Sequence, residues 1–232
     1  MTQSIPLKPA PDLTGAAPPA RTSYHHGNLV DAMVQATISL IEEKGVEAVS
    51  IREATKRAGV SPGAPFRHFA NKTALLTAVA EQAMARLTEA VRQALAQVNS
   101  DDPMEHLRAI AHGYLTWAVE NPTHFQVISS RTLIDFHGSA KLVSENEAIR
   151  VLMADILDRA RAQGRLAPGI ETEDLMLTSR AFAYGLARML IDGHFQEWNV
   201  RKPPREAIKD ATNLFISAMS APDGIKRELR SP

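Results

Sequence analysis

Apolar residues recur at helical spacing along nearly all of the chain after Tyr24. In the first such segment Leu29, Met33 and Leu40 share one face, because residues three, four or seven apart meet on one side of an α-helix. The two-residue alternation of a β-strand stands out nowhere, and no internal repeat is visible. The sequence therefore predicts an all-α fold.

Start and stop signals divide this pattern into segments. Gly45 ends the first, because a residue without a Cβ readily takes the left-handed conformation that follows a helix. Ser50 and Glu53 then form a capping box, in which each side chain bonds the other residue's backbone N–H. The predicted helices are about 24–45, 50–59, a short helix with Ser61 as cap and Pro62 in its first position, 72–99, 103–120, 123–133, 140–163, 172–196 and 204–219.

The composition is that of an ordinary globular protein of one or two domains, with 232 residues, 44% of them hydrophobic, and a formal net charge of zero. Neutrality decides nothing about nucleic acids, since a small reading domain can be locally basic. The absence of cysteine excludes disulfides and suits the reducing cytoplasm, where we expect the protein. No apolar run approaches the roughly 20 residues that cross a bilayer, so no membrane partner is expected.

The segment 1–23 holds five of the fourteen prolines among small and polar residues. It lacks the apolar core of a signal peptide. Such a segment buries too little surface to offset its ordering entropy, so we expect 1–23 to be a flexible tail. The short charged segment 223–232 is expected to be a second tail.

Two short predicted helices, joined by a tight turn at Gly59, lie between Ser50 and Phe69. This is the spacing of a helix-turn-helix, whose second helix enters the major groove of DNA. Gly59 supplies the tolerance of positive φ that the turn requires. Taken alone, such a pair is more often a structural element than a DNA reader. Candidates to pack between the two helices are Ile51, Ala54, Ala58, Val60, Phe66 and Phe69.

The flanks of this unit resemble the N-terminal domain of the TetR family over about residues 24–87. The opening Tyr24–Leu29, YHHGNL, is similar to one branch of that family, which usually has Asp where this chain has Asn28. An aromatic-x-His-Phe-x-x-Lys pattern follows at 66–72. Several motifs at the right spacing are far more specific than any one of them. The resemblance implies a DNA-binding domain at 24–87 and a helical domain for ligand binding and dimerisation at 88–222.

The resemblance also implies which residues contact double-stranded DNA. Arg67 is the candidate for reading a base, since a guanidinium can bridge O6 and N7 of guanine. Lys72 begins a helix, where its charge and the backbone amides both favour a phosphate. Arg21 is a weaker candidate for an adjacent groove. The full set of predicted DNA-contacting positions is Ser50, Arg52, Ser61, Pro62, Gly63, Ala64, Phe66, Arg67, His68 and Lys72.

Aromatic and histidine residues in this region have competing interpretations. The family commonly has Tyr where this chain has Phe66, so one phosphate hydrogen bond, about 0.5–1.5 kcal/mol, is lost. Phe66 and Phe69 are expected to be core residues. His25 and His26 point about 100° apart on a helix and have no further ligand at chelating spacing, so we expect no metal. His68 is expected to contact phosphate or to be a satisfied helix residue rather than a catalytic base.

The region 88–222 carries no phosphate loop, metal motif or catalytic triad pattern, so we expect neither enzyme activity nor a cofactor. The resemblance implies that the helices at 172–196 and 204–219 pair with a second copy, although their apolar stripes are also compatible with their own core. The predicted dimer contacts are Phe182, Leu186, Leu190, Leu214 and Phe215. The predicted ligand-pocket residues are His112, Tyr114, Trp117, Phe125, Ile128, Arg131, Met153 and Phe182, with Gln126 and Arg180 as further polar candidates.

The resemblance thus predicts a homodimeric DNA-binding transcriptional regulator, in the first instance a repressor released from a palindromic operator by a small-molecule effector. A two-fold dimer places its reading helices about 34–36 Å apart, one turn of DNA. The pocket composition suits an apolar or amphipathic effector. Three alternatives remain open: a ligand-independent DNA-binding protein, an activator, and a helical protein-interaction module without DNA binding.

Overall fold

The computed structural model describes residues 26–221, with side chains described from Leu29 onward. Arg21, His25, the side chain of His26 and the two predicted tails lie outside the described residues. The described part is built from helices, with one isolated bridge between Leu166 and Ser220 in place of any sheet, so the all-α prediction is confirmed. The elements are α1 His26–Lys44, η1 Val46–Ala48, α2 Ile51–Ala58, η2 Pro65–Arg67, α3 Lys72–Ala96, α4 Pro103–Glu120, α5 Pro122–Ser129, α6 Ala140–Ala162, α7 Thr172–Ile191, α8 His194–Glu197 and α9 Pro204–Met219.

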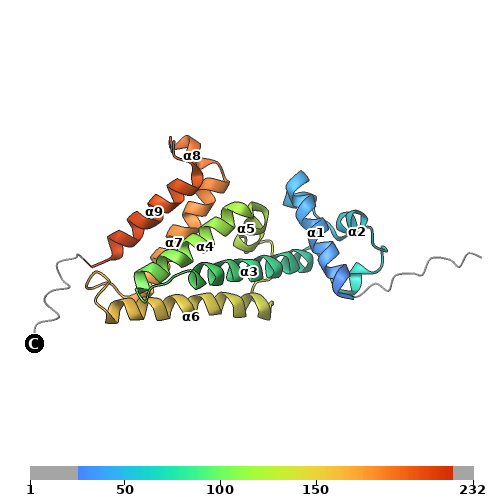
Figure 1. Ribbon diagram of the computed structural model, residues 1–232. Coiled ribbons are helices and arrows are strands. Elements are labelled where there is room, and N and C mark those ends of the chain that lie inside the picture. Colours follow the sequence, from blue (N-terminus) through green and yellow to red (C-terminus); the bar gives the residue numbers. More distant parts are fainter. Residues whose placement is uncertain (1–25, 222–232) are drawn as a thin grey trace, which may run out of the picture.

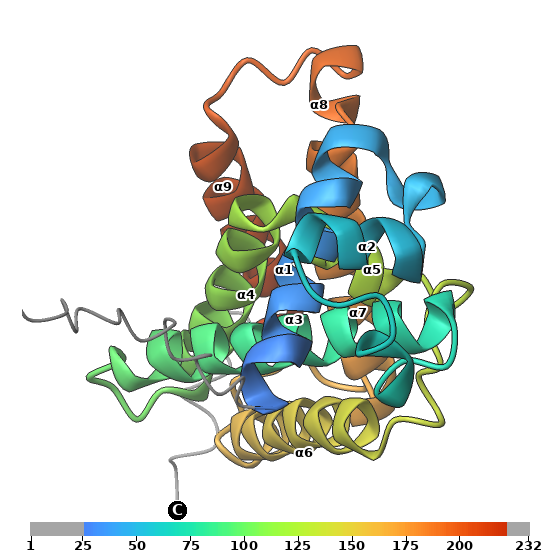
Figure 2. The same cartoon turned by 90° about the vertical axis from the view of Figure 1, so that its right-hand side faces the viewer.

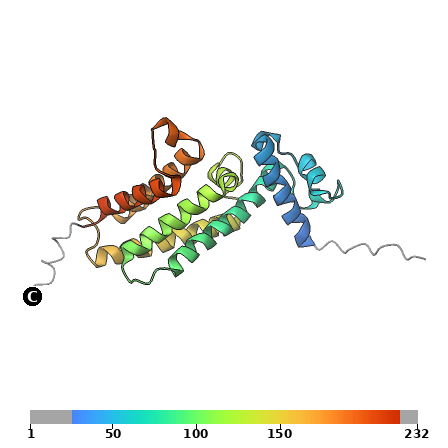
Figure 3. The same cartoon turned by 45° about the horizontal axis from the view of Figure 1, so that its top comes forward.

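The helices form a small unit at one end of an elongated molecule and a larger bundle at the other (Figure 1). The small unit contains α1, α2 and the segment that leads to α3. Figure 2 looks at the molecule from this end, with α1 and α2 in front of the bundle. The helix α3 runs from the small unit into the bundle, as Figure 3 also shows. Within the bundle α4 is central, because it packs against α3, α5, α6, α7 and α9.

Local capping explains where the first helices begin and end. Gly45, at φ 78°, follows α1, and Gly59, at φ 66°, follows α2. The Ser50 hydroxyl accepts a hydrogen bond from the amide of Glu53 at 3.1 Å, which is the serine half of the predicted capping box. Asn71 caps α3 in the same way, accepting from the amide of Ala74 at 2.8 Å. Each side chain satisfies an amide that has no partner inside its helix.

The prediction of a short helix capped by Ser61 is wrong. Residues from Ser61 form a turn, followed by the single 3₁₀ turn of η2, and η2 has no side-chain cap. The reason is local: Pro65 has no N–H with which to continue an α-helical ladder. The amide of Ala64 bonds Ser61 O at 3.1 Å, and that of His68 bonds Pro65 O at 2.9 Å.

Two later helices end before their predicted limits. The helix expected at 123–133 ends at Ser129, after which the chain turns toward α6. The helix expected at 172–196 ends at Ile191, because Gly193, at φ 86°, takes the left-handed conformation and separates the short α8 from α7. The other long helices follow their predicted ranges to within about three residues.

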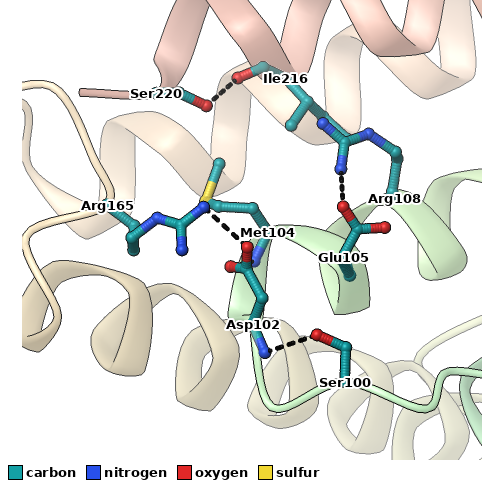
Figure 4. A network of polar contacts seen from close by, with 8 residues as sticks. All are labelled: Ser100, Asp102, Met104, Glu105, Arg108, Arg165, Ile216 and Ser220. Carbon is teal, nitrogen blue, oxygen red and sulfur yellow. Dashed lines mark hydrogen bonds and ion pairs between the residues drawn. The ribbon is translucent and has the colours of Figure 1, made fainter. Parts of the chain in front are cut away.

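The end of the bundle far from α1 and α2 is held by polar contacts between loops (Figure 4). Asp102, the residue before α4, accepts from the amide of Met104 at 3.0 Å and pairs with Arg165 at 2.7 Å. The backbone of Arg165 and Ala167 joins the end of α9, through Ala221 N to Arg165 O at 2.8 Å and Ala167 N to Met219 O at 3.0 Å. The start of α4, the α6–α7 connection and the end of α9 are therefore fastened together.

The helices α3 and α4 are in close contact at Gly113. A Cβ at this position would lie 3.0 Å from Ala94 Cβ and 3.1 Å from both Ala90 O and Val91 Cα. Two of these three atoms are backbone, which cannot rotate away. The absence of a side chain at Gly113 is therefore a requirement of the packing between α3 and α4.

We predict that Gly113→Ala destabilises the protein by about 1–3 kcal/mol, because the added methyl group forces the two helices apart. Urea unfolding monitored by circular dichroism measures the change. Gly63→Ala is the control, since a Cβ there meets nothing within 4 Å. Equal stability of the Gly113 variant and the wild type would show that α3 and α4 adjust without cost.

Candidate nucleic-acid interface and ligand cavity

The segment between α2 and α3 presents an exposed surface made by the predicted DNA-contacting residues. Arg67 and His68 are exposed, and Phe66 is 62% exposed. Ala64 and Lys72 are half-buried. The remaining exposed members of the predicted set are Arg52, Ser61, Pro62 and Gly63. The structure thus brings these side chains to one end of the molecule, while the DNA contacts themselves remain a prediction.

This surface is supported from beneath by buried residues. Phe69 is 3% exposed and Pro65 is buried, so the turn is anchored on both sides of its exposed tip. Ile51 and Ala54 of α2 are buried as predicted. The prediction that Phe66 belongs to the core is wrong. Burial of Pro65 and Phe69 directs the ring between them outward, where it contributes an apolar, not a hydrogen-bonding, contact surface.

Lys72 has a structural contact that the sequence did not predict. Its Nζ donates to Val46 O at 2.8 Å and to Glu47 O at 3.3 Å. The side chain therefore ties the start of α3 to η1, the connection between α1 and α2. An ammonium has three donors, so one remains for a phosphate beside the two carbonyl bonds.

A second tie holds α2 against α1. Arg57 of α2 forms a bidentate ion pair with Glu43 of α1. The hydrogen bond from Arg57 lowers the pKa of Glu43 below its usual value. The charge of Arg57 is thereby neutralised by Glu43 within the protein. Arg52 and Arg67, in contrast, form no ion pair among the described residues.

The junction between the small unit and the bundle is built around His124 of α5. This side chain is 7% exposed; its Nε2 lies 3.4 Å from Nη1 of Arg86 on α3, and its ring meets that of Trp117 edge-on. Burial, and then the charge of Arg86, lower the pKa of His124 below 6.5, while Glu42 of α1 acts in the opposite direction. The buried imidazole is therefore favoured in its neutral form.

Apolar residues of the bundle enclose a cavity of about 70 Å³ between α3, α4, α6, α7 and α9. A smaller hollow of about 20 Å³ adjoins it toward α5. Tyr114, Ile149 and Arg180 line both, so the two hollows meet at these residues. Of the predicted pocket residues, the cavity is lined by Tyr114, Met153 and Phe182, and the smaller hollow by Tyr114, Phe125, Ile128 and Arg131.

The structure places the two other predicted pocket residues elsewhere. Trp117 is buried beside His124 and lines a groove next to α1 rather than the cavity. His112 lines a separate cleft with Arg205 and Lys209 of α9. Burial and the charge of Lys209 lower the pKa of His112. Gln126, a further candidate, is exposed.

The predicted dimer residues differ in their exposure. Leu214 of α9 is 73% exposed, and Leu177 of α7, a large apolar residue outside the predicted set, is 69% exposed. Phe182 and Phe215 stack on each other, with centroids 4.4 Å apart, and both line the cavity. Leu186 and Leu190 are half-buried. Both α7 and α9 therefore present a large exposed leucine, and the stacked phenylalanine pair connects the two helices.

Comparison with known families decides what this arrangement belongs to. A family model described as "Bacterial regulatory proteins, tetR family" matches residues 34–79, which include α2 and the exposed turn. A second, described as "Tetracyclin repressor-like, C-terminal domain", matches residues 107–212. Together they cover more than half of the chain. The chain belongs to the TetR family.

Individual proteins show how far the likeness extends. The transcriptional regulator BetI of Yersinia pestis is 41% identical over 81 residues, which are 35% of this chain and 41% of that protein. This chain therefore matches less than half the length of its curated TetR relatives. A Rhodococcus sp. RHA1 protein of unknown function is 25% identical with a TM-score of 0.70, covering 87% of this chain and all of that one. A tetR-family regulatory protein from Rhodococcus RHA1 has a TM-score of 0.67 at 18% identity, over 84% and 98% of the two chains.

Among residues 26–221, no three His, Asp or Glu side chains are grouped as a metal would require. The helices in this range are all too short or too polar to span a bilayer.

We predict that the protein loses stability as the pH falls below about 6.5. A folded histidine with a depressed pKa binds fewer protons than the unfolded chain at pH values between that pKa and 6.5, so the free energy of unfolding decreases with falling pH. Urea unfolding at a series of pH values measures this slope. His124→Gln should make the slope shallower without abolishing it, because His112 contributes with the same sign.

Gln126→Ala, at an exposed residue of α5 that does not titrate, is the control and should leave the slope as in the wild type. A slope unchanged in the His124 variant would mean that the buried imidazole is protonated as readily in the folded protein as in the unfolded chain.

Proposed function

We propose that this TetR-family protein is a homodimeric transcriptional repressor of the cytoplasm that binds a palindromic operator and is released from it by a small ligand. The observation that carries the proposal is the position of the exposed turn with Arg67. The turn directly precedes α3, and α3 also lines the cavity. Val91, near the other end of α3, is one of the cavity residues. One continuous helix thus links the proposed reading surface to the proposed ligand site.

The turn has the features of a DNA-reading surface despite its irregular backbone. Arg67 offers the fork of donors that matches guanine, and no carboxylate of the described residues pairs with it. Arg52 flanks it from α2 and suits a phosphate contact. Phe66 has no hydrogen bond to give, and its exposed ring suits the methyl group of a thymine or a sugar.

Release by a ligand requires that the ligand bind one arrangement of the dimer better than another. A ligand lodged between α4, α7 and α9 changes how α4, which packs against α7 and α9, is seated on α3. Because α3 carries the exposed turn at its start, such a change alters the distance between the two reading surfaces of the dimer. The operator affinity then falls only by as much as the ligand's affinities for the two arrangements differ.

We predict that the purified protein selects a palindromic site from a random DNA library, and that Arg67→Ala loses its preference at one base pair in each half-site. Each bidentate contact that is lost should lower the free energy of discrimination between the correct and a wrong base by about 1–3 kcal/mol. Arg92→Ala, which removes an exposed arginine from α3, is the matched control and should keep the full preference.

Enrichment of no sequence at low salt would contradict the DNA-reading proposal, since phosphate contacts bind most strongly there. An unchanged preference in the Arg67 variant would move the reading role to another residue of the turn.

We predict that Leu214→Asp converts the dimer to a monomer, because a charge would then have to be buried in the proposed α7–α9 interface. Sedimentation equilibrium measures the change in mass. Val151→Asp, at an apolar residue of α6 that is 52% exposed, is the control and should remain dimeric. A dimer that survives the Leu214 substitution would place the interface on another face.

A further inference from the structure

Two arginines stand at the junction of the cavity and the smaller hollow without an acidic partner. Arg180 of α7 lines both spaces, and Arg131, in the connection between α5 and α6, lines the smaller one. No Asp or Glu is among the lining residues of either space. In the described part of the chain, neither guanidinium lies within 4.0 Å of a carboxylate, whereas Arg57, Arg108, Arg165 and Arg188 all have one.

The partners that these two arginines do have leave their charge uncompensated. Arg131 donates to Ile128 O at 2.9 Å and lies over the ring of Phe136, with its Cζ 3.9 Å from the centroid. Arg180 lies over the ring of Tyr114, 6.0 Å from the centroid. Burial, and then the charge of Arg180, lower the pKa of Arg131, so the two cations are near enough to repel each other. An anion placed between them relieves this repulsion.

The space beyond the arginines is apolar. It is lined by Leu107, Ile110, Met153, Phe182, Phe215 and Ile216. A space of about 70 Å³ exceeds what one water requires several times over, and a cavity with such walls favours an alkyl chain over water. The outer sides of Arg131 and Arg180 are exposed, so they stand at the mouth of this space.

We propose that the ligand is an amphipathic anion, whose carboxylate or similar group is held between Arg131 and Arg180 and whose apolar chain enters the cavity beside Phe182 and Met153. The inference rests on the proposed function, because it names the chemical class of that ligand. The cation pair sets the charge of the head, and the apolar walls set the nature of the tail. Neutral apolar molecules and cations are thereby excluded as preferred ligands.

The test compares decanoate with 1-decanol, which has the same chain and no charge. Binding to the DNA-free protein is measured by isothermal titration calorimetry at about pH 7.5, where a carboxylate is ionised. We expect decanoate to bind at least about tenfold more tightly than decanol, the ratio that one charge-assisted hydrogen bond supplies. Arg131→Gln and Arg180→Gln should each remove most of this preference and leave decanol binding unchanged.

Arg188→Gln is the matched control, because it removes the same charge from α7 at a residue that pairs with Asp192 and does not line the cavity. Its preference for decanoate should equal that of the wild type. Equal affinity for decanoate and decanol, binding of neither, or a preference that survives in the double variant of Arg131 and Arg180 would overturn the proposal.

This experiment fails separately from the proposed function. If the protein selects a palindromic site but shows no preference for decanoate, the ligand class is wrong and the DNA-reading proposal stands. If decanoate binds through the two arginines but no DNA sequence is selected, the ligand class stands and the proposed function is wrong.

Discussion

The apolar stripe of α3 is the constraint on which the rest of the structure depends. Its buried residues extend from Leu75 to Val91; the helix packs against α1 in the small unit and against α4, α5 and α6 in the bundle. A helix of 25 residues is about 37 Å long, and this one contains neither glycine nor proline at which to bend. Lys72 and Asn71 fix its start, and Gly113 fixes the distance to α4. The small unit and the bundle are therefore aligned by the single helix α3, and neither has a complete hydrophobic core without it.

The features that were predicted correctly from the sequence have their causes close together in the chain. Gly45, Gly59, Ser50 and Asn71 act on amides within a few residues, so the limits of α1, α2 and α3 were predictable. The irregular turn before α3 also has a local cause, because Pro65 lacks the N–H that a regular helix capped by Ser61 would need. The remaining differences have distant causes. Lys72 bonds carbonyls some 25 residues earlier, and no pattern in the sequence pairs them.

The two faces of α4 illustrate why pocket residues are harder to predict than helices. Trp117 and Tyr114 lie one turn apart and both contact α5, yet Trp117 lines the groove next to α1 while Tyr114 lines the cavity. Periodicity distinguishes a buried side from an exposed one, but α4 is surrounded by five helices and has several buried sides. Which of them borders a cavity depends on how the neighbouring helices pack. Phe66 shows the same limit, since hydrophobicity predicts burial and only the anchoring of Pro65 and Phe69 shows that the ring points outward.

The contact at Gly113 determines which kind of motion the bundle permits. Where two helices touch backbone to backbone, displacement along their axes by one residue brings a Cβ onto the place that the glycine occupies, so α4 cannot shear past α3. Rotation about the contact point moves atoms there very little and is allowed. The polar ties at the far end, from Asp102 to Arg165 and onward to the end of α9, carry α9 along with such a rotation. In a rotation about this contact, residues of α4 would be displaced more the farther they lie from Gly113, so the largest shifts would occur at the two ends of the helix.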